Sequence, residues 1–382
     1  MMEREIVIVG AGPSGSATAI SLAKQGHDVL LLDRKDFPRD KTCGDGIPAG
    51  AVEVLYSLGM EEKIHQAEFY PVDRILLSSP REYVLEADLK PGETGASSYV
   101  VPRMKFDTLI QEHAVDCGAD FRQAQVQEPI VEDGRVVGVR AKMNGSVEEI
   151  RSKVVIGADG VTSAVARALR PDKHEDGHRA IALRSYTEDL EVRPHQVEFY
   201  LYKGILPGYA WIFPFSENQT NLGLGMRLDK YRDVDKSLED MVEVFLEMPV
   251  IKQRLKRGGE LKDVAVWQLN FGSRPMKRAY DGAILVGDAA GLINPLTGGG
   301  IHNGLQSALL AGEIVHDALA KDDLTLNTLQ HYDAQLEEMM RGNMRKSYWI
   351  QRTLIRMPLW VDLLIRFGGA NSEVAKIFID KL

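Results

Sequence analysis

Residues 10–15 read Gly-Ala-Gly-Pro-Ser-Gly, and this stretch decides how the N-terminal part of the chain folds. It follows the apolar run Ile6–Val9, which has the length and composition of a short buried strand. Beyond it, Ser16–Gln25 has a helical pattern that stops at Gly26, and Asp28–Leu32 reads as a second strand. The order strand, glycine turn, helix, strand predicts one βαβ unit.

The three glycines have the spacing of a dinucleotide-binding turn. Gly10 permits the tight turn, Gly12 lets a pyrophosphate approach the backbone, and Gly15 lets helix and strand pack closely. The helix N-terminus stabilises negative charge, and Asp33 ends the second strand where an acid can accept hydrogen bonds from ribose hydroxyls. The alternative is a glycine turn that serves packing alone. The residues assigned to the dinucleotide are Gly10, Gly12, Pro13, Ser14, Gly15, Asp33 and Arg34.

The composition is that of a soluble globular protein and narrows the possible partners. The formal net charge of -9 argues against a nucleic-acid partner, because binding phosphates requires a basic surface. Cys43 and Cys117 are the only cysteines among 382 residues, which favours a reducing compartment over a disulfide framework. The N-terminus lacks the pattern of a signal peptide, and no stretch reaches the ~20 apolar residues of a membrane-spanning helix. We therefore expect a cytoplasmic protein.

The remainder of the chain shows two kinds of pattern. Residues 104–117 have helical spacing, and Asp133-Gly134 is a hairpin signal. Between about Arg179 and Met226 the alternation favours an antiparallel sheet. The strand-like runs are Ala119–Gln127, Pro129–Val131, Arg135–Ala141, Val154–Gly157 and Ala283–Val286, and, within the second pattern, 180–187, 196–202, 209–214 and 220–226. The expected division is a discontinuous nucleotide-binding domain (1–68, 100–175 and 276–330), a substrate domain (69–99 and 176–275) and a C-terminal helical segment (331–382).

Two further glycine motifs follow at long intervals. Residues 157–160 read Gly-Ala-Asp-Gly, and residues 287–291 read Gly-Asp-Ala-Ala-Gly, with three more glycines at 298–300. Together with the turn at 10–15, they resemble the three fingerprints of the para-hydroxybenzoate hydroxylase superfamily in kind and order. The resemblance implies an α/β fold, with a Rossmann-type (GR2-like) FAD-binding domain and an antiparallel-sheet substrate domain. A second turn like that at 10–15 is missing, which fits a superfamily in which a nicotinamide donor docks only transiently.

The same resemblance implies roles for individual residues. Asp288 would bind the ribityl chain, and residues 298–301 would meet the flavin at a helix N-terminus. Arg103 lies in an arginine-containing turn that would run along the FAD, and Val126 lies where the adenine-contacting strand is expected. Arg167 comes one position later than in the hydroxylases, so its role is left open. The cofactor residues added in this way are Arg103, Val126, Asp159, Gly160, Gly287, Asp288, Gly298, Gly299, Gly300 and Ile301.

Three segments are similar to those of geranylgeranyl reductases within this superfamily. They are Lys-Thr-Cys-Gly-Asp-Gly at 41–46, Tyr-Ala-Trp-Ile-Phe-Pro at 209–214 and Pro-Leu-Thr-Gly-Gly-Gly-Ile at 295–301. Hydroxylases typically carry histidine where this chain has Gly291. The resemblance implies reduction of isolated C=C bonds in a polyprenyl lipid by reduced FAD, with NAD(P)H or ferredoxin as transient electron donor. It leaves open whether the lipid head group is a diphosphate, an archaeal ether lipid or a quinone.

The segment at 209–214 has the pattern of a cavity wall. Tyr209, Trp211 and Phe213 alternate, so on a strand they share one face, and Pro214 ends the run. Hydride transfer to an alkene needs the flavin within about 3–3.5 Å of a carbon atom, in a site that excludes water. An aromatic face suits that requirement, and these four residues are assigned to substrate binding. The alternative is a core strand of the sheet.

Cys43 is the candidate catalytic residue. Its neighbours Gly44 and Gly46 suggest a loop that passes close to a ligand. The resemblance to the reductases places Cys43 and Gly44 near the flavin ring, where the thiol could gate the site or relay a proton. The alternative is a small buried thiol that packs against the flavin. Cys117 reads as a core residue, and the sequence assigns no metal ligands.

The C-terminal segment combines apolar and basic residues. Trp349, Trp360 and Phe367 are interleaved with basic residues such as Arg345 and Arg366. This composition suits the interface of an anionic bilayer and predicts peripheral docking at the inner face of the membrane. Two alternatives are a helical pair that packs on the protein's own core and a dimer contact.

Two other functions compete with a lipid reductase. The same fold carries flavin-dependent monooxygenases (hydroxylases) and halogenases, although the Trp-rich motif and catalytic lysine of halogenases have no evident counterpart here. An electron-transfer flavoprotein without an organic substrate is the other alternative, and it would lack a hydrophobic tunnel that reaches the flavin.

Overall fold

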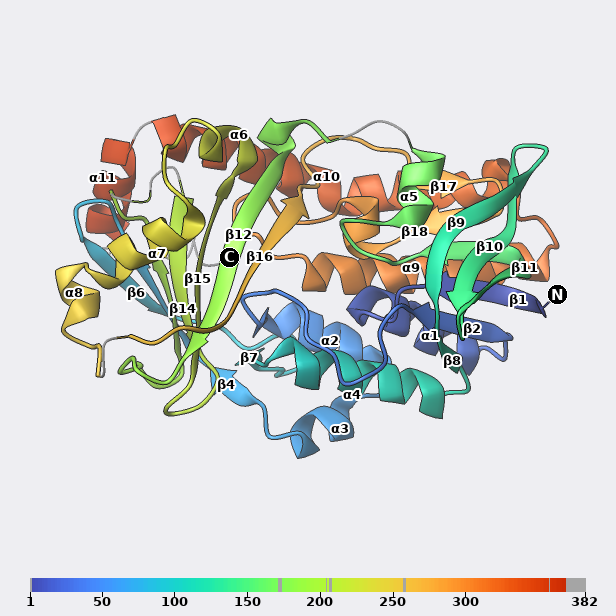
Figure 1. Ribbon diagram of the computed structural model, residues 1–382, viewed down its shortest axis with the longest axis horizontal. Coiled ribbons are helices and arrows are strands. Elements are labelled where there is room, and N and C mark those ends of the chain that lie inside the picture. The colour runs from blue at the N-terminus through green and yellow to red at the C-terminus, as the bar shows by residue number, and fades with distance from the viewer. Residues whose placement is uncertain are drawn as a thin grey trace.

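The computed structural model describes residues 2–170, 174–203, 205, 208–256, 259–356 and 358–368 of the chain. The molecule is elongated, with one large sheet in each half and the long helix α10 (Leu326–Arg356) running across both halves (Figure 1). The half that contains the N-terminus is built on a mainly parallel sheet, and the other half on a mainly antiparallel sheet. This is the predicted combination of fold classes.

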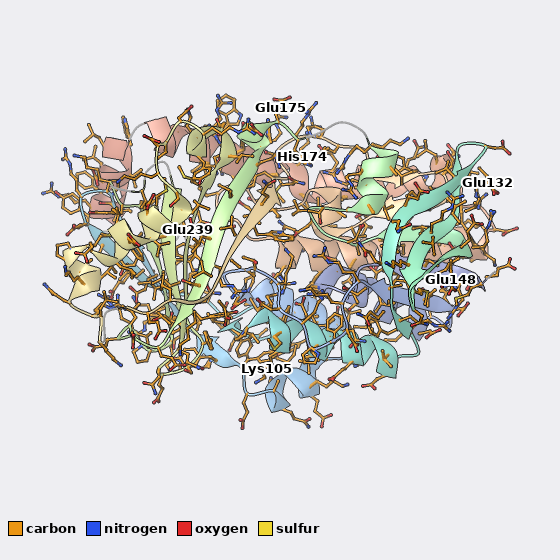
Figure 2. All side chains as sticks on the ribbon, in the orientation of Figure 1. Lys105, Glu132, Glu148, His174, Glu175 and Glu239 are labelled. Atoms are coloured by element: carbon orange, nitrogen blue, oxygen red, sulfur yellow. The ribbon has the colours of Figure 1, made fainter. Side chains whose placement is uncertain are left out.

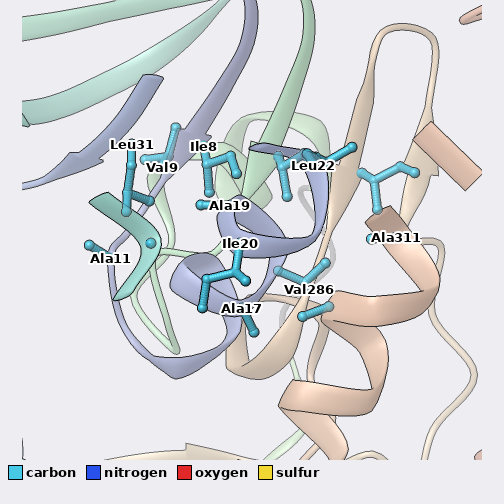
Figure 3. Close-up of a cluster of buried hydrophobic side chains, with 14 of the residues drawn as sticks. Ile8, Val9, Ala11, Ala17, Ala19, Ile20, Leu22, Leu31, Val286 and Ala311 are labelled. Atoms are coloured by element: carbon cyan, nitrogen blue, oxygen red, sulfur yellow. The ribbon is translucent and has the colours of Figure 1, made fainter. Parts of the chain in front are cut away.

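The first sheet has the strand order β17-β18-β11-β1-β2-β8, with β10 and β9 extending from β11. Residues 6–9 of β1 and all of β2 are buried, as expected for central parallel strands that are covered on both faces. Helix α1 (Pro13–Lys24) begins with a proline, which suits the first helical position, and its alanine-rich surface packs between the sheet and α9 (Ile301–Ala320) (Figure 3). The strands are β1 (Met2–Val9), β2 (Val29–Asp33), β8 (Asp120–Gln123), β9 (Gln125–Glu132), β10 (Arg135–Met143), β11 (Ser146–Gly157), β17 (Ala279–Tyr280) and β18 (Ala283–Leu285).

Most of the strand predictions in this half are confirmed, but one boundary is wrong. The hairpin forms at Asp133 and Gly134, both with positive φ, between β9 and β10. The predicted strand Ala119–Gln127 is instead interrupted at Ala124. The residues before Ala124 form β8, which pairs with β2, and the residues after it begin β9. β9 then continues through Pro129, which the sequence pattern placed at the start of a new strand. A proline is tolerated there because β9 is an edge strand that pairs only with β10.

The second sheet has the strand order β16-β12-β15-β14-β13-β5-β6. The four predicted runs correspond to β12, β13, β14 and β15, and their mutual pairings are antiparallel. The predicted antiparallel arrangement of this stretch is therefore confirmed. The sheet also contains one parallel pairing, between β13 and β5, because β5 enters from a segment much earlier in the chain. The strands are β5 (Arg74–Ser78), β6 (Val84–Asp88), β12 (Arg179–Thr187), β13 (Gln196–Tyr200), β14 (Gly208–Pro214), β15 (Thr220–Arg227) and β16 (Lys262–Asn270).

Shorter elements cover and connect the two sheets. Helix α7 (Leu238–Leu246) buries Leu238, Met241, Val242 and Phe245 against one face of the second sheet, which leaves the opposite face for the interior of the molecule. The remaining elements are β3 (Gly46–Ile47), α2 (Ala49–Ser57), α3 (Glu61–Gln66), β4 (Tyr70–Val72), β7 (Ser98–Val100), α4 (Arg103–Asp116), α5 (Ala164–Leu169), η1 (Asp176–His178), α6 (Leu228–Tyr231), α8 (Pro249–Lys252) and η2 (Gly287–Ala290).

The C-terminal helices join the two halves. Near the start of α10, the Tyr332 hydroxyl donates a hydrogen bond of 2.9 Å to the carbonyl oxygen of Leu285 in the first sheet. α10 ends at Arg356, and α11 (Pro358–Gly368) packs on β6 of the second sheet. No helix within the described ranges is long and apolar enough to cross a bilayer. Residues 369–382 of the predicted C-terminal segment lie outside the described residues, and the proposed domain boundaries remain a prediction.

Candidate functional site

One cavity of about 1180 Å³ lies between the two halves and brings the predicted site residues together. The lining includes residues from all three glycine motifs, the Cys43 loop and the aromatic strand β14. Gly15 and Gly287 lie behind this lining, and Pro214 is buried at the end of β14 without facing the cavity. The predicted site residues that line the cavity are Gly10, Gly12, Pro13, Ser14, Asp33, Arg34, Cys43, Gly44, Arg103, Val126, Asp159, Gly160, Tyr209, Trp211, Phe213, Asp288, Gly298, Gly299, Gly300 and Ile301.

The first glycine turn depends on the absence of side chains at two positions. Gly10 has φ +102°, and a Cβ atom there would lie 2.4 Å from the carbonyl oxygen of Ala158. A Cβ atom at Gly15 would lie 1.8 Å from the carbonyl oxygen of Gly10, so the helix can approach the strand only with glycine. Gly12 instead faces the cavity, where its exposed backbone leaves room for a phosphate.

A chain of ion pairs connects Asp33, at the end of β2, to Arg103. Asp33 accepts a hydrogen bond of 2.9 Å from the amide of Ala11, and its Oδ2 lies 3.4 Å from Nη2 of Arg39. Arg39 also pairs with Asp107, which holds Arg103 through two hydrogen bonds of 2.5 and 2.7 Å. The Arg103 guanidinium in turn favours the thiolate of Cys43 and so opposes the rise of its pKa. The sequence pattern did not identify Arg39, because a single arginine after a strand carries no motif.

The second glycine motif shapes its own loop. Asp159 accepts hydrogen bonds from the Ser163 hydroxyl and, at 2.6 Å, from the amide of Ala164, at the N-terminus of α5. Burial raises the pKa of the Asp159 carboxyl, and these hydrogen bonds oppose that shift. Arg167, whose role was left open, lines the cavity from the same helix. A contact of Asp159 with the cofactor remains a prediction.

The third glycine motif touches the aromatic strand. The Tyr209 hydroxyl donates a hydrogen bond of 3.0 Å to the carbonyl oxygen of Thr297, and a Cβ atom at Gly298 would lie 2.9 Å from that hydroxyl. Gly298 also has φ +69°, so both the backbone conformation and the closeness of the Tyr209 hydroxyl favour glycine at this position. Gly300 precedes α9 without a side-chain cap, which leaves the backbone N–H groups of the helix start available to a ligand. The hydrogen bond between Tyr209 and Thr297 therefore places the N-terminus of α9 beside β14.

Burial raises the pKa of the Cys43 thiol. The Arg103 guanidinium opposes this rise, and the nearby Asp45 carboxylate adds to it. Cys117, at the end of α4, is partly buried against the core of the first half, in agreement with its prediction as a core residue.

Two aromatic side chains of β14, Trp211 and Phe213, pack directly against glycine residues. Trp211 lies across β15, where a Cβ atom at Gly223 would come within 2.3 Å of its ring. Phe213 packs on the Cys43 loop, because Cβ atoms at Gly44 and Gly46 would lie 3.4 and 3.2 Å from its ring. The predicted common face of Tyr209, Trp211 and Phe213 therefore forms one wall of the cavity.

The family models and relatives agree on the class of protein. The FAD binding domain family matches residues 3–345. Digeranylgeranylglycerophospholipid reductase 1 of Methanopyrus kandleri is 33% identical over 94% of this chain and 92% of its own length. A menaquinone reductase of Mycolicibacterium smegmatis is 30% identical over 81% of this chain and 76% of its own length. The chain belongs to the geranylgeranyl reductase family of FAD-binding proteins. It is an FAD-dependent oxidoreductase.

Solved structures support the same assignment. A geranylgeranyl bacteriochlorophyll reductase-like protein from Thermoplasma acidophilum superimposes with a TM-score of 0.85 and 25% identity, covering 100% of both chains. A myxobacterial chondrochloren halogenase superimposes with a TM-score of 0.78 and 22% identity, over 91% of this chain and 82% of the halogenase. At this identity the halogenase shares the fold alone. The cavity fits FAD, because Gly12 and the uncapped start of α9 present backbone to it where phosphates and a flavin ring require close approach.

In this geranylgeranyl reductase family member, the wall beside β14 includes residues that the sequence pattern did not single out. β12 supplies Ala180, Ala182 and Arg184, and β16 supplies Trp267 and Leu269, each set alternating along its strand, and Phe271 follows directly after β16. α10 closes the cavity with Met340, Asn343, Met344 and Gln351. Alternation within β12 was visible in the sequence, but which of its faces meets the cavity depends on the packing of α7 on the other side.

A lysine at the cavity lies over an aromatic ring. Lys41 Nζ is 4.0 Å from the ring centre of Trp267, a cation–π contact. Burial lowers the pKa of Lys41 to about 8. The lysine is therefore the cationic group at this site that loses its charge most easily, whereas Arg103 and Arg184 remain charged.

A histidine occupies the space beside Gly291, the position at which hydroxylases carry histidine. The ring of His174 lies 3.0 Å from the place of a Cβ atom on Gly291, and Gly291 has φ +69°. His174 precedes Glu175 near the start of β12, at the top of the view in Figure 2. Burial, together with Arg170 and Arg179, lowers the pKa of His174 to about 3, so its imidazole is neutral. The space that a side chain at position 291 would occupy is thus filled by His174, from another part of the chain.

Proposed function

We propose that this oxidoreductase saturates isolated C=C bonds of a polyprenyl lipid. The observation that carries the proposal is the shared cavity, in which the FAD motifs form one wall and an apolar, aromatic sheet face forms the opposite wall. The Tyr209–Thr297 hydrogen bond holds these walls in contact. The reductase relatives, named for a digeranylgeranyl phospholipid and for menaquinone, support a prenyl-chain substrate.

The chain's own residues would hold the cofactor and orient the lipid. FAD, when bound and reduced, supplies the hydride. The predicted cofactor residues along the first glycine turn, the ion-pair chain and the α9 N-terminus would hold the phosphates, ribose and flavin ring. Tyr209, Trp211 and Phe213 would position the alkene, with Met340 and Met344 of α10 excluding water from the opposite side. Cys43 would supply or gate the proton that the reaction consumes, and NAD(P)H or ferredoxin would reduce the flavin transiently.

We also propose that α11 docks on the cytoplasmic surface of an anionic membrane. The helix turns Val361 and Ile365 inward, where they pack with Leu77 and Leu85 of the second sheet. Its outward side chains are more than two-fifths exposed and apolar: Leu359, Trp360, Leu363 and Phe367. Exposed basic residues lie nearby in sequence: Arg345 and Lys346 on α10, and Arg366 on α11. Apolar side chains flanked by basic ones suit a surface of anionic lipid.

The docking helix also forms part of the cavity wall. Val361 lines the cavity together with Pro80 of the β5–β6 turn. Between them, buried Asp362 accepts hydrogen bonds of 2.7 Å from the Ser79 hydroxyl and 2.9 Å from the amide of Arg81. Helix α11 therefore separates the surface proposed to meet the bilayer from the part of the cavity proposed for the lipid chain. A substrate drawn from the bilayer would have a short path to the cavity.

The test is a single turnover without any donor. The FAD-loaded protein is reduced with dithionite under argon and mixed with a geranylgeranyl phospholipid in detergent, with the fully saturated lipid as control. Flavin reoxidation with the unsaturated lipid only, and a lipid mass increased by H2 per double bond, would support the proposal. If neither lipid reoxidises the flavin and an aromatic compound is hydroxylated or halogenated in oxygen instead, the monooxygenase or halogenase alternative holds.

A further inference from the structure

Two aromatic residues of the cavity wall lie in one row across the second sheet. Trp267 of β16 pairs with Ala182 of β12, Ala182 pairs with Gly225 of β15, and Gly225 pairs with Tyr209 of β14. All four residues line the cavity. Neighbouring strands lie about 4.8 Å apart, so the backbones at the two ends of the row are about 14 Å apart. Only small side chains lie between them, and the flat indole of Trp211 comes within 3.8 Å of the place of a Cβ atom on Gly225.

Each end of this row carries a contact to another part of the site. At one end, the Tyr209 hydroxyl donates a hydrogen bond of 3.0 Å to the carbonyl oxygen of Thr297, in the third glycine motif. At the other end, Nζ of Lys41 lies 4.0 Å from the ring centre of Trp267. Lys41 itself lines the cavity. The space above the row is therefore bounded by the third glycine motif on one side and by an ammonium group on the other.

Lys41 differs from the buried or nearly buried arginines that line the same cavity, because each of those has an aspartate partner. The pairs are Arg39–Asp33, Arg103–Asp107, Arg184–Asp40 and Arg227–Asp229. Within the parts of the chain that the structure describes, Lys41 has neither a hydrogen bond nor an ion pair, and the ring of Trp267 is its contact. A cation–π contact leaves the N–H donors of the ammonium without acceptors. The lysine is thus a cation whose anionic partner a bound ligand would supply.

The surroundings of Lys41 indicate which part of FAD would meet it. Burial lowers the pKa of Lys41 to about 8, and the Asp288 carboxylate opposes that shift more than any other charged group. Asp288 lies at the start of α9, where its Oδ1 atom is 3.0 Å from the place of a Cβ atom on Gly300. These two residues are the ones assigned to the ribityl chain and the flavin ring, whereas the phosphates are assigned to Gly12. The position of Lys41 therefore favours the flavin ring over the diphosphate.

We propose that Lys41 contacts the flavin ring of bound FAD and stabilises the negative charge that the ring takes up on reduction. A hydride added to the ring brings its negative charge with it, and a nearby cation favours the reduced form. Trp267 holds the ammonium at the wall without neutralising it. The inference rests on the proposed placement of FAD in this cavity and on no property of the lipid.

The experiment measures the midpoint potential of the bound flavin. The FAD-loaded proteins are reduced slowly under argon beside a dye of known potential, and the absorbances of flavin and dye are read together. We expect Lys41→Met to shift the ratio of reduced to oxidised flavin at least tenfold toward the oxidised form, a fall of about 30 mV. Lys41→Arg keeps the charge and should retain most of the wild-type potential. Lys321→Met removes an exposed lysine after the far end of α9 and should leave the potential unchanged.

A second variant and a binding measurement make the result decisive. If Lys41→Met does not hold FAD, Trp267→Leu, which keeps the charge but removes the ring beneath it, should lower the potential by a smaller amount. An unchanged potential with weaker binding of oxidised FAD would assign Lys41 to the diphosphate and overturn the inference. An unchanged potential with loss of the preference for a prenyl phosphate over the prenyl alcohol would assign it to the lipid head group and overturn it as well. The potential is measured without lipid, so failure of the proposed lipid reduction leaves this result standing.

Discussion

The side-chain amide of Asn221 donates hydrogen bonds of 2.8 Å both to the carbonyl oxygen of Cys43 and to Oδ2 of Asp45. Its own oxygen accepts a hydrogen bond of 2.8 Å from Nε1 of Trp211. One buried amide in β15 therefore ties the cysteine loop to the substrate sheet and orients the central aromatic side chain of the cavity. Both of its N–H donors and its oxygen are engaged within the site.

Removing this amide should loosen the loop. We expect Asn221→Ala to lower the free energy of unfolding by roughly 3 kcal/mol, because it leaves the Cys43 carbonyl and the Trp211 N–H buried without partners. Urea denaturation measures the change. Asn218→Ala, at an exposed position of the preceding turn, is the matched control and should change little. Equal stability of the two variants would mean that Asn221 does not clamp the loop.

The first glycine turn should tolerate no side chain at its helix end. We expect Gly15→Ala to be isolated without flavin, because its Cβ atom would lie 1.8 Å from the Gly10 carbonyl oxygen and would force the turn open. The visible flavin absorbance of the purified protein gives the result. Gly342→Ala, in α10 with nothing within 4 Å of the new atom, should keep the flavin and gain up to about 1 kcal/mol in stability. Normal flavin content in Gly15→Ala would contradict the packing argument.

The glycine beneath Trp211 should control the shape of the substrate wall. In Gly223→Ala the new Cβ atom would lie 2.2 Å from the Leu183 carbonyl oxygen and 2.3 Å from the indole ring, so both the pairing of β12 with β15 and the ring must shift. We expect flavin to remain bound and flavin reoxidation by the prenyl lipid to slow at least tenfold. Anaerobic stopped-flow absorbance measures both quantities in one sample. Reoxidation at the wild-type rate would show that Trp211 does not contact the lipid.

The buried Asp45 carboxyl should make stability depend on pH. Its pKa is about 6 in the folded protein, above the ordinary value of 3.8, so the folded state binds more protons than the unfolded state between these values. Stability from this group is therefore lost as the pH rises through that range. Relative to wild type, Asp45→Asn should gain about 2–3 kcal/mol between pH 4 and pH 7. Urea denaturation across pH tests the slope, and a difference between the two proteins that does not vary with pH would rule it out.

The apolar face of α11 should determine membrane binding. We expect Trp360→Ser with Phe367→Ser to abolish flotation with vesicles of anionic phospholipid while flavin content stays unchanged, because both side chains point outward. Neutral vesicles should bind the wild type more weakly, and high salt should reduce the difference. Val147→Ser, at an exposed position of β11, is the control for loss of an apolar surface residue. If the double variant instead floats normally but changes its mass in solution, the face is a dimer contact.

The sequence alone determined the nucleotide-binding half almost completely. Gly10, Gly15, Asp133-Gly134 and the runs at β1, β2 and β11 depend on local backbone conformation and on periodicity, which neighbouring residues carry. Motifs of this kind also identified the cofactor, because phosphate and flavin binding require backbone at fixed spacings. The face shared by Tyr209, Trp211 and Phe213 followed from strand alternation in the same way.

Only the tertiary structure decided which distant side chains meet around Cys43. Asn221 is 178 positions away from it, and the Arg39–Asp107–Arg103 chain is assembled from a loop and a helix that share no sequence pattern. His174 fills the space beside Gly291 in the same manner. Such contacts depend on how two sheets and α10 pack together, and burial then sets the ionisation of Cys43 and Asp45. The glycine turn specified the cofactor class locally, whereas the electrostatics of the reaction site arise from long-range packing.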